Sequence, residues 1–482
     1  MPEQSLLKNY IYNLALTVAN LIFPLIVFAY ISRIIGPEGI GKVNFASTLA
    51  SYFVLFGVFG VNTYGVRTIA SLRHDPIKLK VVFNELFLIN CITISISFCL
   101  YLLFILINYK TKTDLPLFLI NGVTVFFALF SFDWLFQGLE NYKYITIRSL
   151  IIKIVVILLI FMFVKKKEDY IIYALLFVLG GSANYLFNLY YARKLIGIDF
   201  RNINIKRHFP VLIHFAVISV IVSLYSGMDK LLLGYLAGDY YVGLYVPANR
   251  ISQLLLGLIT SMSSVLYPRM SNIHYNGTRE EINSMISKSL HAVLLLAVPL
   301  FVGTEVLADN LIWLLSGEEF LSSIGTLRIE AFMIIPVAIA NIAGTQALVA
   351  TGNEKKYLFS VVCGSIVFLI SAFLCIPILK QNGAAVSLVL AEMFGAILEL
   401  ILARSYFRNA TRTRQVLSII MSAAIMGIVV YLIKSLLNYS LLSSLFLALF
   451  GAILYFLFLL VLKDSIVLEF KDMIRTKICK KT

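Results

Sequence analysis

Apolar stretches of about 20 residues follow one another along almost the whole chain, and they constrain its fold more than any other feature of the sequence. Hydrophobic residues fill 60% of the 482 positions and charged residues only 13%, whereas soluble domains have about 45–50% and about 25%. About 20 apolar residues suffice for one helix to cross a membrane. We therefore predict an all-α polytopic membrane protein with about 14 transmembrane helices. The predicted spans are 9–32, 42–64, 84–107, 115–137, 147–164, 170–192, 209–232, 240–266, 287–315, 324–350, 357–378, 383–403, 415–434 and 440–462.

A motif near the N-terminus returns in the middle of the chain. The segment IIGPEGIGKVNFA at 34–46 resembles LAGDYYVGLYVPA at 236–248 at a constant shift of 202 residues. Each copy of such a repeat would hold six spans, and an even number returns the chain to its starting side, so the copies share one orientation. We expect two parallel six-helix repeats that form two lobes around a central cavity, followed by two extra C-terminal helices.

These repeats define the expected domains. The N-terminal six-helix lobe covers 1–200, the C-terminal six-helix lobe covers 201–407, and 408–482 holds the two additional helices and a basic cytoplasmic tail. Most of the 40 Lys and Arg residues fall in loops on the same side as the N-terminus. By the positive-inside rule, both termini are expected in the cytoplasm, and the basic face is expected to contact anionic membrane lipids.

Several classes of function do not fit this sequence. The net charge of +15 is distributed over membrane loops, so no nucleic-acid partner is expected. The five cysteines form no C-x-x-C pair, and neither a disulfide, a metal site nor another cofactor is indicated. No G-x-x-x-x-G-K-[ST] loop is present, which argues against direct use of ATP. We expect a transporter that is not an enzyme.

Particular phrases carry a resemblance to a known family. The phrase GPEGIG at 36–41 with Phe45-Ala46, ANR at 248–250 and YPR at 267–269, together with the repeat plan and the two extra helices, resemble the bacterial polysaccharide-repeat-unit flippases. These are the O-antigen (Wzx-type) translocases of the multidrug/oligosaccharidyl-lipid/polysaccharide exporter superfamily.

The resemblance implies a function. The substrate would be an undecaprenyl-diphosphate-linked oligosaccharide, moved from the inner to the outer leaflet of the bacterial cytoplasmic (inner) membrane for O-antigen or capsule biosynthesis. Because no ATP-binding loop is present, the energy would come from an ion gradient or from the substrate gradient, and we expect coupling to an ion. The polysaccharide polymerase and the chain-length regulator would be partners. Arg250 matches an arginine that related lipid-linked peptidoglycan precursor flippases have in a similar phrase, where it is implicated in holding the diphosphate. The position equivalent to Arg250 in the first copy of the repeat, 202 residues earlier, is occupied by Thr48.

Arg250 is a candidate substrate-binding residue on physical grounds as well. It lies about ten residues into its span, hence about 15 Å deep in a core of about 30 Å. A charged side chain there is costly unless it faces a wet cavity or a partner. Its planar fork suits a diphosphate, which it could grip through two hydrogen bonds. A structural ion pair between helices is the alternative.

Two glutamates in span twelve are candidates for ion coupling or gating. Glu392 lies at nearly the depth of Arg250, so a pair between them is a hypothesis. An incoming diphosphate would then displace Glu392 from Arg250, and the released carboxylate would take up a proton. Glu399 is seven residues further on the same helical face, nearer the cytoplasm. An ion pair at a helix interface is the alternative for both.

Further charged residues near span ends complete the candidates. Asp133, in the phrase SFDWLFQG, would line the inner mouth of the cavity and serve coupling or gating; alternatively, it lies at the interface beside an anchoring Trp134. Lys153 is within snorkelling distance of the cytoplasmic headgroups, and we consider it for substrate binding.

Asp229 and Lys230 end span seven and point about 100° apart on a helix. We consider Asp229 for coupling or gating and Lys230 for substrate binding. Arg33, at the outer end of span one, would meet the diphosphate as it leaves, unless it lies among headgroups.

Two other functions compete with the flippase. A multidrug or cation exporter of the same fold would favour an acidic cavity and 12 spans. A membrane glycan polymerase would need a sizeable outer loop with clustered charges, and the longest outer loop, at about 316–325, is short.

Overall fold

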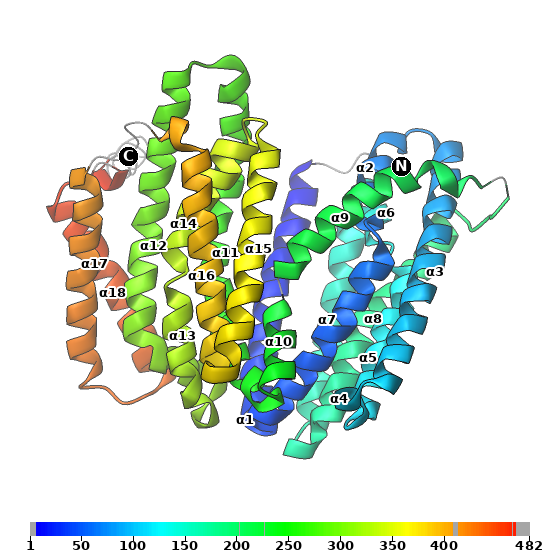
Figure 1. Ribbon diagram of the computed structural model, residues 1–482, viewed down its shortest axis with the longest axis horizontal. Coiled ribbons are helices and arrows are strands. Elements are labelled where there is room, and N and C mark those ends of the chain that lie inside the picture. The colour runs from blue at the N-terminus through cyan, green and yellow to red at the C-terminus, as the bar shows by residue number, and fades with distance from the viewer. Residues whose placement is uncertain (1–5, 202, 226, 408–412, 465, 469–482) are drawn as a thin grey trace, which may run out of the picture. The chain divides into compact units, whose positions relative to one another are not determined.

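The computed structural model describes residues 6–201, 203–225, 227–407, 413–464 and 466–468. These residues form helices joined by short loops, with no strand among them (Figure 1). The chain divides into two compact units, Met1–Gly243 and Leu244–Thr482. The all-α architecture predicted from the apolar stretches is confirmed, whereas the domain limits drawn from the repeat remain predictions.

Within the described part of the chain, 12 helices are long and apolar enough to cross a membrane. The prediction of about 14 differs from this number at two places. The first predicted span and most of the second lie in one element, α1 (Leu6–Val58). The predicted span 209–232 is divided into α9 (Phe209–Tyr225) and α10 (Met228–Leu236), with Gly227 at φ 108° between them. The number of about 14 crossings therefore stays a prediction.

Unit 1 is built around α1. Its elements, in chain order, are α1, α2 (Val61–Leu72), α3 (Pro76–Ile107), α4 (Tyr109–Lys112), α5 (Leu115–Phe127), η1 (Ala128–Phe130), α6 (Asp133–Gly138), α7 (Tyr142–Phe163), η2 (Lys167–Asp169), α8 (Tyr170–Leu195), η3 (Ile205–Arg207), α9, α10 and the start of α11 (Asp239–Asn276). Helices α3, α5 and α7 all pack against α1.

Helix α1 is kinked at Gly36, whose φ of 67° and ψ of −178° are not helical. Only glycine adopts this conformation at little cost. Pro37 follows, and its restricted φ suits the first turn of the helix that resumes after the kink. Figure 1 shows α1 as two blue legs that meet near its label. With 53 residues, α1 is about 80 Å long, over twice the thickness of about 30 Å of a membrane core.

The duplicated motif makes a close contact within unit 1. A Cβ atom at Gly41 would overlap the backbone carbonyl of Asp239, and a Cβ atom at Gly243 would overlap the backbone carbonyl of Pro37. The two glycines and the two carbonyl residues are each 202 positions apart. Lys110 contacts both copies of the motif beside these glycines. Its ammonium group pairs with the Asp239 carboxylate at 2.8 Å and lies 4.3 Å from the centre of the Phe45 ring.

A second region of unit 1, where α2, α3 and α6 meet, has an aromatic core. Trp134 of α6 is only 2% exposed and lies so close to Gly65 that a Cβ atom there would come within 2.6 Å of the indole. The Trp134 ring lies 5.8 Å from Phe83, and Phe87 packs edge-on against Phe132 at 4.9 Å. The alternative in which Trp134 anchors its helix at the membrane surface is therefore wrong, because the ring is buried among other side chains.

A polar cluster anchors the segment before α9 to α2 and α3. Glu85 of α3 is 1% exposed and accepts hydrogen bonds from the Arg207 guanidinium, at 3.1 Å from Nε, and from the backbone N–H of Asn204 at 2.9 Å. His208 contacts Glu85 through Nε2 at 2.9 Å and the Tyr64 hydroxyl through Nδ1 at 2.8 Å. Such saturation is what a buried carboxylate requires.

Unit 2 continues with the rest of α11 and the helices that follow. Its further elements are α12 (Arg279–Ser316), η4 (Glu318–Ser323), α13 (Ile324–Ala331), α14 (Ile334–Ala340), η5 (Asn341–Val349), α15 (Glu354–Leu379), α16 (Gln381–Leu402), η6 (Arg404–Tyr406), α17 (Thr413–Lys434) and α18 (Leu441–Val461). Element η5 is a π-helix of nine residues that continues from α14. Helices α15 and α16 form a tight hairpin, with Lys380 at φ 54° in the turn.

The two extra C-terminal helices pack against α12, beside which Figure 1 shows α17 and α18 in orange and red. Ala423 of α17 and Leu459 of α18 are fully buried in a shared apolar cluster with α12. The Tyr455 hydroxyl donates to the Leu295 carbonyl at 2.9 Å. At the end of α18, His291 contacts the Asp464 carboxylate at 3.0 Å. These helices are thus an integral part of unit 2.

Candidate functional site

A second polar cluster of unit 1 surrounds Asp133, the first residue of α6. Its Oδ1 accepts hydrogen bonds from Nη2 of Arg148 at 2.9 Å and from the side-chain amide of Asn188 at 3.0 Å. The Arg148 side chain is 6% exposed, whereas the Asp133 side chain is 42% exposed. The cation of this pair is therefore buried, and the carboxylate keeps acceptor capacity for a ligand or a proton.

Arg148 is held from several sides. Its Nε donates to the side-chain oxygen of Asn184 at 3.0 Å, Nη1 donates to the side-chain oxygen of Asn188, and the guanidinium lies 5.2 Å from the centre of the Tyr144 ring. Helices α6, α7 and α8 each contribute to this arrangement. A buried charge that is paired and hydrogen-bonded in this way can persist in a low-dielectric interior.

The sequence analysis missed Arg148, because its position near the end of a predicted span suggested a loop cation. A usable signal was present in the partner helix. Asn184 and Asn188 stand four residues apart in an apolar span, so they share one helix face. Two amides on one face inside a membrane helix indicate a polar partner on a neighbouring helix.

Lys153 and Arg33 lie on different helices of unit 1. The Lys153 ammonium group of α7 contacts the Asn20 side-chain oxygen of α1 and lies 5.9 Å from the centre of the Phe23 ring. It therefore links α7 to the first leg of α1. Arg33 is exposed, three residues before the kink at Gly36, and its guanidinium donates to the Ala29 carbonyl.

Asp229 and Lys230 lie in the first turn of α10, not at the end of one long span as predicted. The Asp229 side chain is buried, and its Oδ1 accepts a hydrogen bond from the backbone N–H of Lys230 at 2.8 Å. The Lys230 residue is half-buried. A Cβ atom at Gly227 would lie 3.3 Å from Cγ2 of Thr48, so the start of α10 packs closely against α1.

Unit 2 contains the remaining predicted residues. Arg250 is half-buried on α11, and Glu392 is half-buried on α16. The predicted pair between these two side chains remains a prediction.

Glu399 has the most distinctive surroundings of the residues predicted in unit 2. It is 5% exposed, and its Oε1 accepts a hydrogen bond from the Ser360 hydroxyl of α15 at 2.9 Å. Its Oε2 is buried and has no hydrogen-bond partner within the described part of the chain. A Cβ atom at Gly344 of the π-helix would lie 2.6 Å from this oxygen. The carboxyl group is thus enclosed by α15, α16 and η5, with acceptor capacity left over.

The π-helix carries a second buried polar group that the sequence analysis missed. Gln346 is fully buried, and neither atom of its side-chain amide has a hydrogen-bond partner among the described residues. Glu330 of α13 is fully buried as well. Short π-helical stretches are frequent at functional sites. No simple periodicity in the sequence distinguishes this stretch from an ordinary helix, so it could not have been predicted.

Comparison with known proteins identifies the family. A family model described as "Polysaccharide biosynthesis protein" matches residues 6–274. The chain belongs to this polysaccharide biosynthesis protein family. A second model, described as MatE, matches residues 215–376.

Alignments of this chain with named relatives cover nearly the full length of each relative. A protein of Escherichia coli (strain K12) provisionally named an O-antigen transporter is 24% identical over 413 residues, which are 83% of this chain and 97% of the relative. The capsular polysaccharide biosynthesis protein CapF of Staphylococcus aureus is 22% identical over 404 residues, which are 81% of this chain and 98% of the relative.

Solved structures share the fold of this family member. The inward closed conformation of the lipid II flippase MurJ superposes with a TM-score of 0.75 at 18% identity, over 95% of this chain and 100% of that chain. An inward-facing multidrug resistance MATE family transporter of the MOP superfamily superposes with a TM-score of 0.65 at 16% identity, over 84% and 99%. The chain is therefore a multi-pass membrane protein with the fold of these transporters.

Proposed function

We propose that this protein translocates undecaprenyl-diphosphate-linked oligosaccharide repeat units from the inner to the outer leaflet of the bacterial cytoplasmic membrane, for O-antigen or capsule biosynthesis. The observation that carries the proposal is the family match over residues 6–274, together with a relative named as an O-antigen transporter that aligns over 97% of its length. The fold shared with a lipid II flippase supports it.

The proposed mechanism assigns the diphosphate to Arg250. Its fork of donors can bind two phosphate oxygens at once, which a lysine cannot do with the same geometry. Glu392 pairs with Arg250 before the substrate arrives and is released when the diphosphate binds. Arg33, Lys153 and Lys230 serve as further cationic contacts along the path.

Coupling to an ion is assigned to acidic groups. The buried Glu399, with an oxygen that has no hydrogen-bond partner in the described structure, supports this assignment. A proton is the smallest ion that can bind there, and it would neutralise a carboxylate that is only 5% exposed, which lowers the cost of its burial. Asp133 and Asp229 are assigned to gating in unit 1.

The protein acts as a transporter without catalysing a chemical reaction, and both of its termini lie in the cytoplasm. Membrane lipids surround it, and the polysaccharide polymerase and chain-length regulator receive its product. The names of the relatives as transporters and polysaccharide biosynthesis proteins support the role as a transporter, and the distribution of Lys and Arg over the loops supports the cytoplasmic termini.

Leaflet-resolved detection of lipid-linked repeat units tests the proposal. Cells that lack the protein should accumulate the repeat units in the cytoplasmic leaflet, and the intact gene should reverse this. Accumulation of unpolymerised units in the outer leaflet would instead indicate a polymerase.

The same assay tests Arg250 and Glu392. Arg250→Ala, Arg250→Lys and Glu392→Gln should each slow translocation at normal protein level. Glu354→Gln, at the first residue of α15 and exposed, serves as the matched control and should leave translocation unchanged. Normal translocation in all three variants would overturn the assignment.

A multidrug exporter is the second candidate function. The MatE match over residues 215–376 favours it. Drug efflux that depends on the protein, with no change in the distribution of lipid-linked repeat units, would select this alternative.

A further inference from the structure

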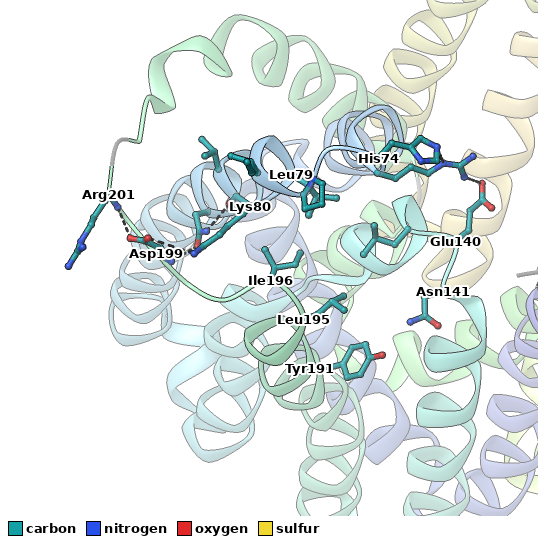
Figure 2. Close-up of a pocket in the computed structure, with 16 residues that line it drawn as sticks. His74, Leu79, Lys80, Glu140, Asn141, Tyr191, Leu195, Ile196, Asp199 and Arg201 are labelled. Carbon is teal, nitrogen blue, oxygen red and sulfur yellow. Dashed lines mark hydrogen bonds and ion pairs between the residues drawn. The ribbon is translucent and has the colours of Figure 1, made fainter. Parts of the chain in front are cut away.

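A pocket of about 960 Å³ lies at one end of unit 1. The connections from α2 to α3, from α6 to α7, and after α8 surround it (Figure 2). Positive-inside reasoning predicts these connections on the cytoplasmic side. The pocket therefore lies where a substrate made in the cytoplasm would arrive.

Charged side chains stand at two sides of this pocket. Arg73 pairs with Glu140 at 2.8 Å, and Lys80 lies 3.8 Å from the Asp199 carboxylate. Figure 2 shows Lys80 and Asp199 on one side and Glu140 on the other, with the apolar Ile196 between them. Each pair offers both donors and acceptors, which is what the hydroxyl groups of sugars require.

A second, more apolar groove of about 480 Å³ adjoins the pocket, because Asn141 and Tyr191 line both. Three exposed apolar side chains line this groove: Ile147 (42% exposed), Ile151 (57%) and Phe187 (52%). At the junction, Tyr191 stacks on Tyr144 with ring centres 4.3 Å apart.

Two cations line this groove, and one of them, Arg148, is buried and paired with Asp133. Lys143 is exposed, lies two residues after Asn141 and lines the groove. Two ion pairs, an exposed cation and an apolar groove thus follow one another along one surface of unit 1. A ligand that fits this order has a polar head, an anionic group and a long apolar chain.

We propose that the pocket and the groove together form a loading site for the lipid-linked oligosaccharide on the cytoplasmic side of unit 1, an inference that rests on the proposed function. The sugars occupy the pocket between the two ion pairs. The diphosphate lies beside Lys143 and Asn141. The polyprenyl chain runs along Ile147, Ile151 and Phe187.

Two features favour this ligand over an ordinary anionic phospholipid. A volume of about 960 Å³ is near the upper end of about 300–1,000 Å³ that is typical of ligand pockets, and a phospholipid headgroup would fill little of it. In addition, the acidic partners Glu140 and Asp199 offset two of the cations. Neutral hydroxyl groups match such a lining better than a compact anion does.

Site-specific photocrosslinking in cells tests the proposal on the full chain. The photoreactive residue p-benzoylphenylalanine replaces Tyr191, and in a matched control it replaces the adjacent Tyr190, which is 69% exposed and lines neither cavity. Radiolabelled lipid-linked oligosaccharide should crosslink at position 191 and not at position 190. Crosslinking of phospholipid alone at 191, or equal oligosaccharide crosslinking at both positions, would overturn the proposal.

A charge reversal provides the second test. Lys143→Glu should weaken loading about tenfold through loss of attraction to the diphosphate, and excess substrate should restore the translocation rate. Lys194→Glu, an exposed control on the same predicted side that lines neither cavity, should behave like the unmodified protein. An equal response of both variants would contradict the site.

Different results would reject the proposed function and the loading site. Repeat units that reach the outer leaflet normally in cells without the protein would reject the proposed function. Translocation that requires the protein but is indifferent to Lys143→Glu and gives no crosslink at position 191 would reject the loading site alone.

Discussion

Gly41 and Gly243 pack reciprocally: each lies against the backbone carbonyl of the residue four positions before the other glycine. Gly41 meets the carbonyl of Asp239, and Gly243 meets that of Pro37. Both contacts leave no room for a side chain. The motif that the chain contains twice is therefore also the place where its two copies touch within unit 1.

Alanine at either glycine should destabilise the protein. An added methyl group would overlap a backbone carbonyl, which cannot rotate away as a side chain can. We expect Gly41→Ala and Gly243→Ala to lower the free energy of unfolding by about 1–3 kcal/mol each, measured by thermal unfolding in detergent. Gly257→Ala, in open space on α11, is the control. Equal stability of all three variants would contradict the packing.

The buried pair in unit 1 should respond asymmetrically to mutation. Asp133→Ala leaves Arg148, whose side chain is 6% exposed, without its carboxylate, whereas Arg148→Ala leaves an aspartate that is 42% exposed and can be hydrated. An unpaired buried charge costs about 3–5 kcal/mol, and an exposed one costs much less. Asp133→Ala should therefore be the more destabilising change in denaturant unfolding. The opposite order would show that Asn184 and Asn188 alone suffice for Arg148.

Gly344→Ala should disturb Glu399. The new methyl group would lie 2.6 Å from Oε2 of Glu399 and 2.9 Å from the Tyr357 ring, so the carboxyl group has to move. We expect translocation per folded molecule to fall, with a stability loss of about 1–3 kcal/mol. Gly364→Ala, whose nearest contact would be 3.5 Å away, is the control. Unchanged translocation in Gly344→Ala would argue against a role of Glu399 in coupling.

Asp75 should make the start of α3 sensitive to acid. Its carboxylate accepts a hydrogen bond from the backbone N–H of Lys78 at 3.1 Å, and this bond, with the Lys78 ammonium group, lowers the pKa of Asp75 below its ordinary 3.8. A lowered pKa stabilises the fold above pH 3.8, and this contribution is lost as the pH falls through the value in the folded state. The midpoint of unfolding should drop over that range. Asp75→Asn, which caps a helix without titrating, should remove this part of the pH dependence.

The sequence predicted the fold well because its main signal is strong. Stretches of about 20 apolar residues have few alternatives to a membrane helix, and most predicted spans correspond to helices of the structure. The differences arise at Gly36 and Gly227, where a residue with positive φ decides between a kink and a loop. Such a choice depends on what packs around the glycine, which no local pattern reveals.

The candidate site was less predictable. Asp133 is a candidate because it lies near the end of a predicted span, and Glu399 because it shares a helix face with Glu392; both prove to lie in polar clusters. Their partners Arg148 and Ser360 were not found, because they stand on other helices and the rotation of one helix against another is a tertiary property. The burial of Gln346, whose amide has no hydrogen-bond partner among the residues that the structure describes, depends in the same way on a local π-helical distortion.

The reciprocity of Gly41 and Gly243 also bears on the origin of the chain. In a symmetric dimer, if one residue touches a second across the axis, the second touches the first in return. The contacts of Gly41 with Asp239 and of Gly243 with Pro37 obey this rule within a single polypeptide. This geometry is what the fusion of two copies of a half-length, self-pairing chain would leave. Gly41 and Gly243, where the contact leaves no room for a side chain, are the same in both copies of the motif, whereas most other positions of the motif differ.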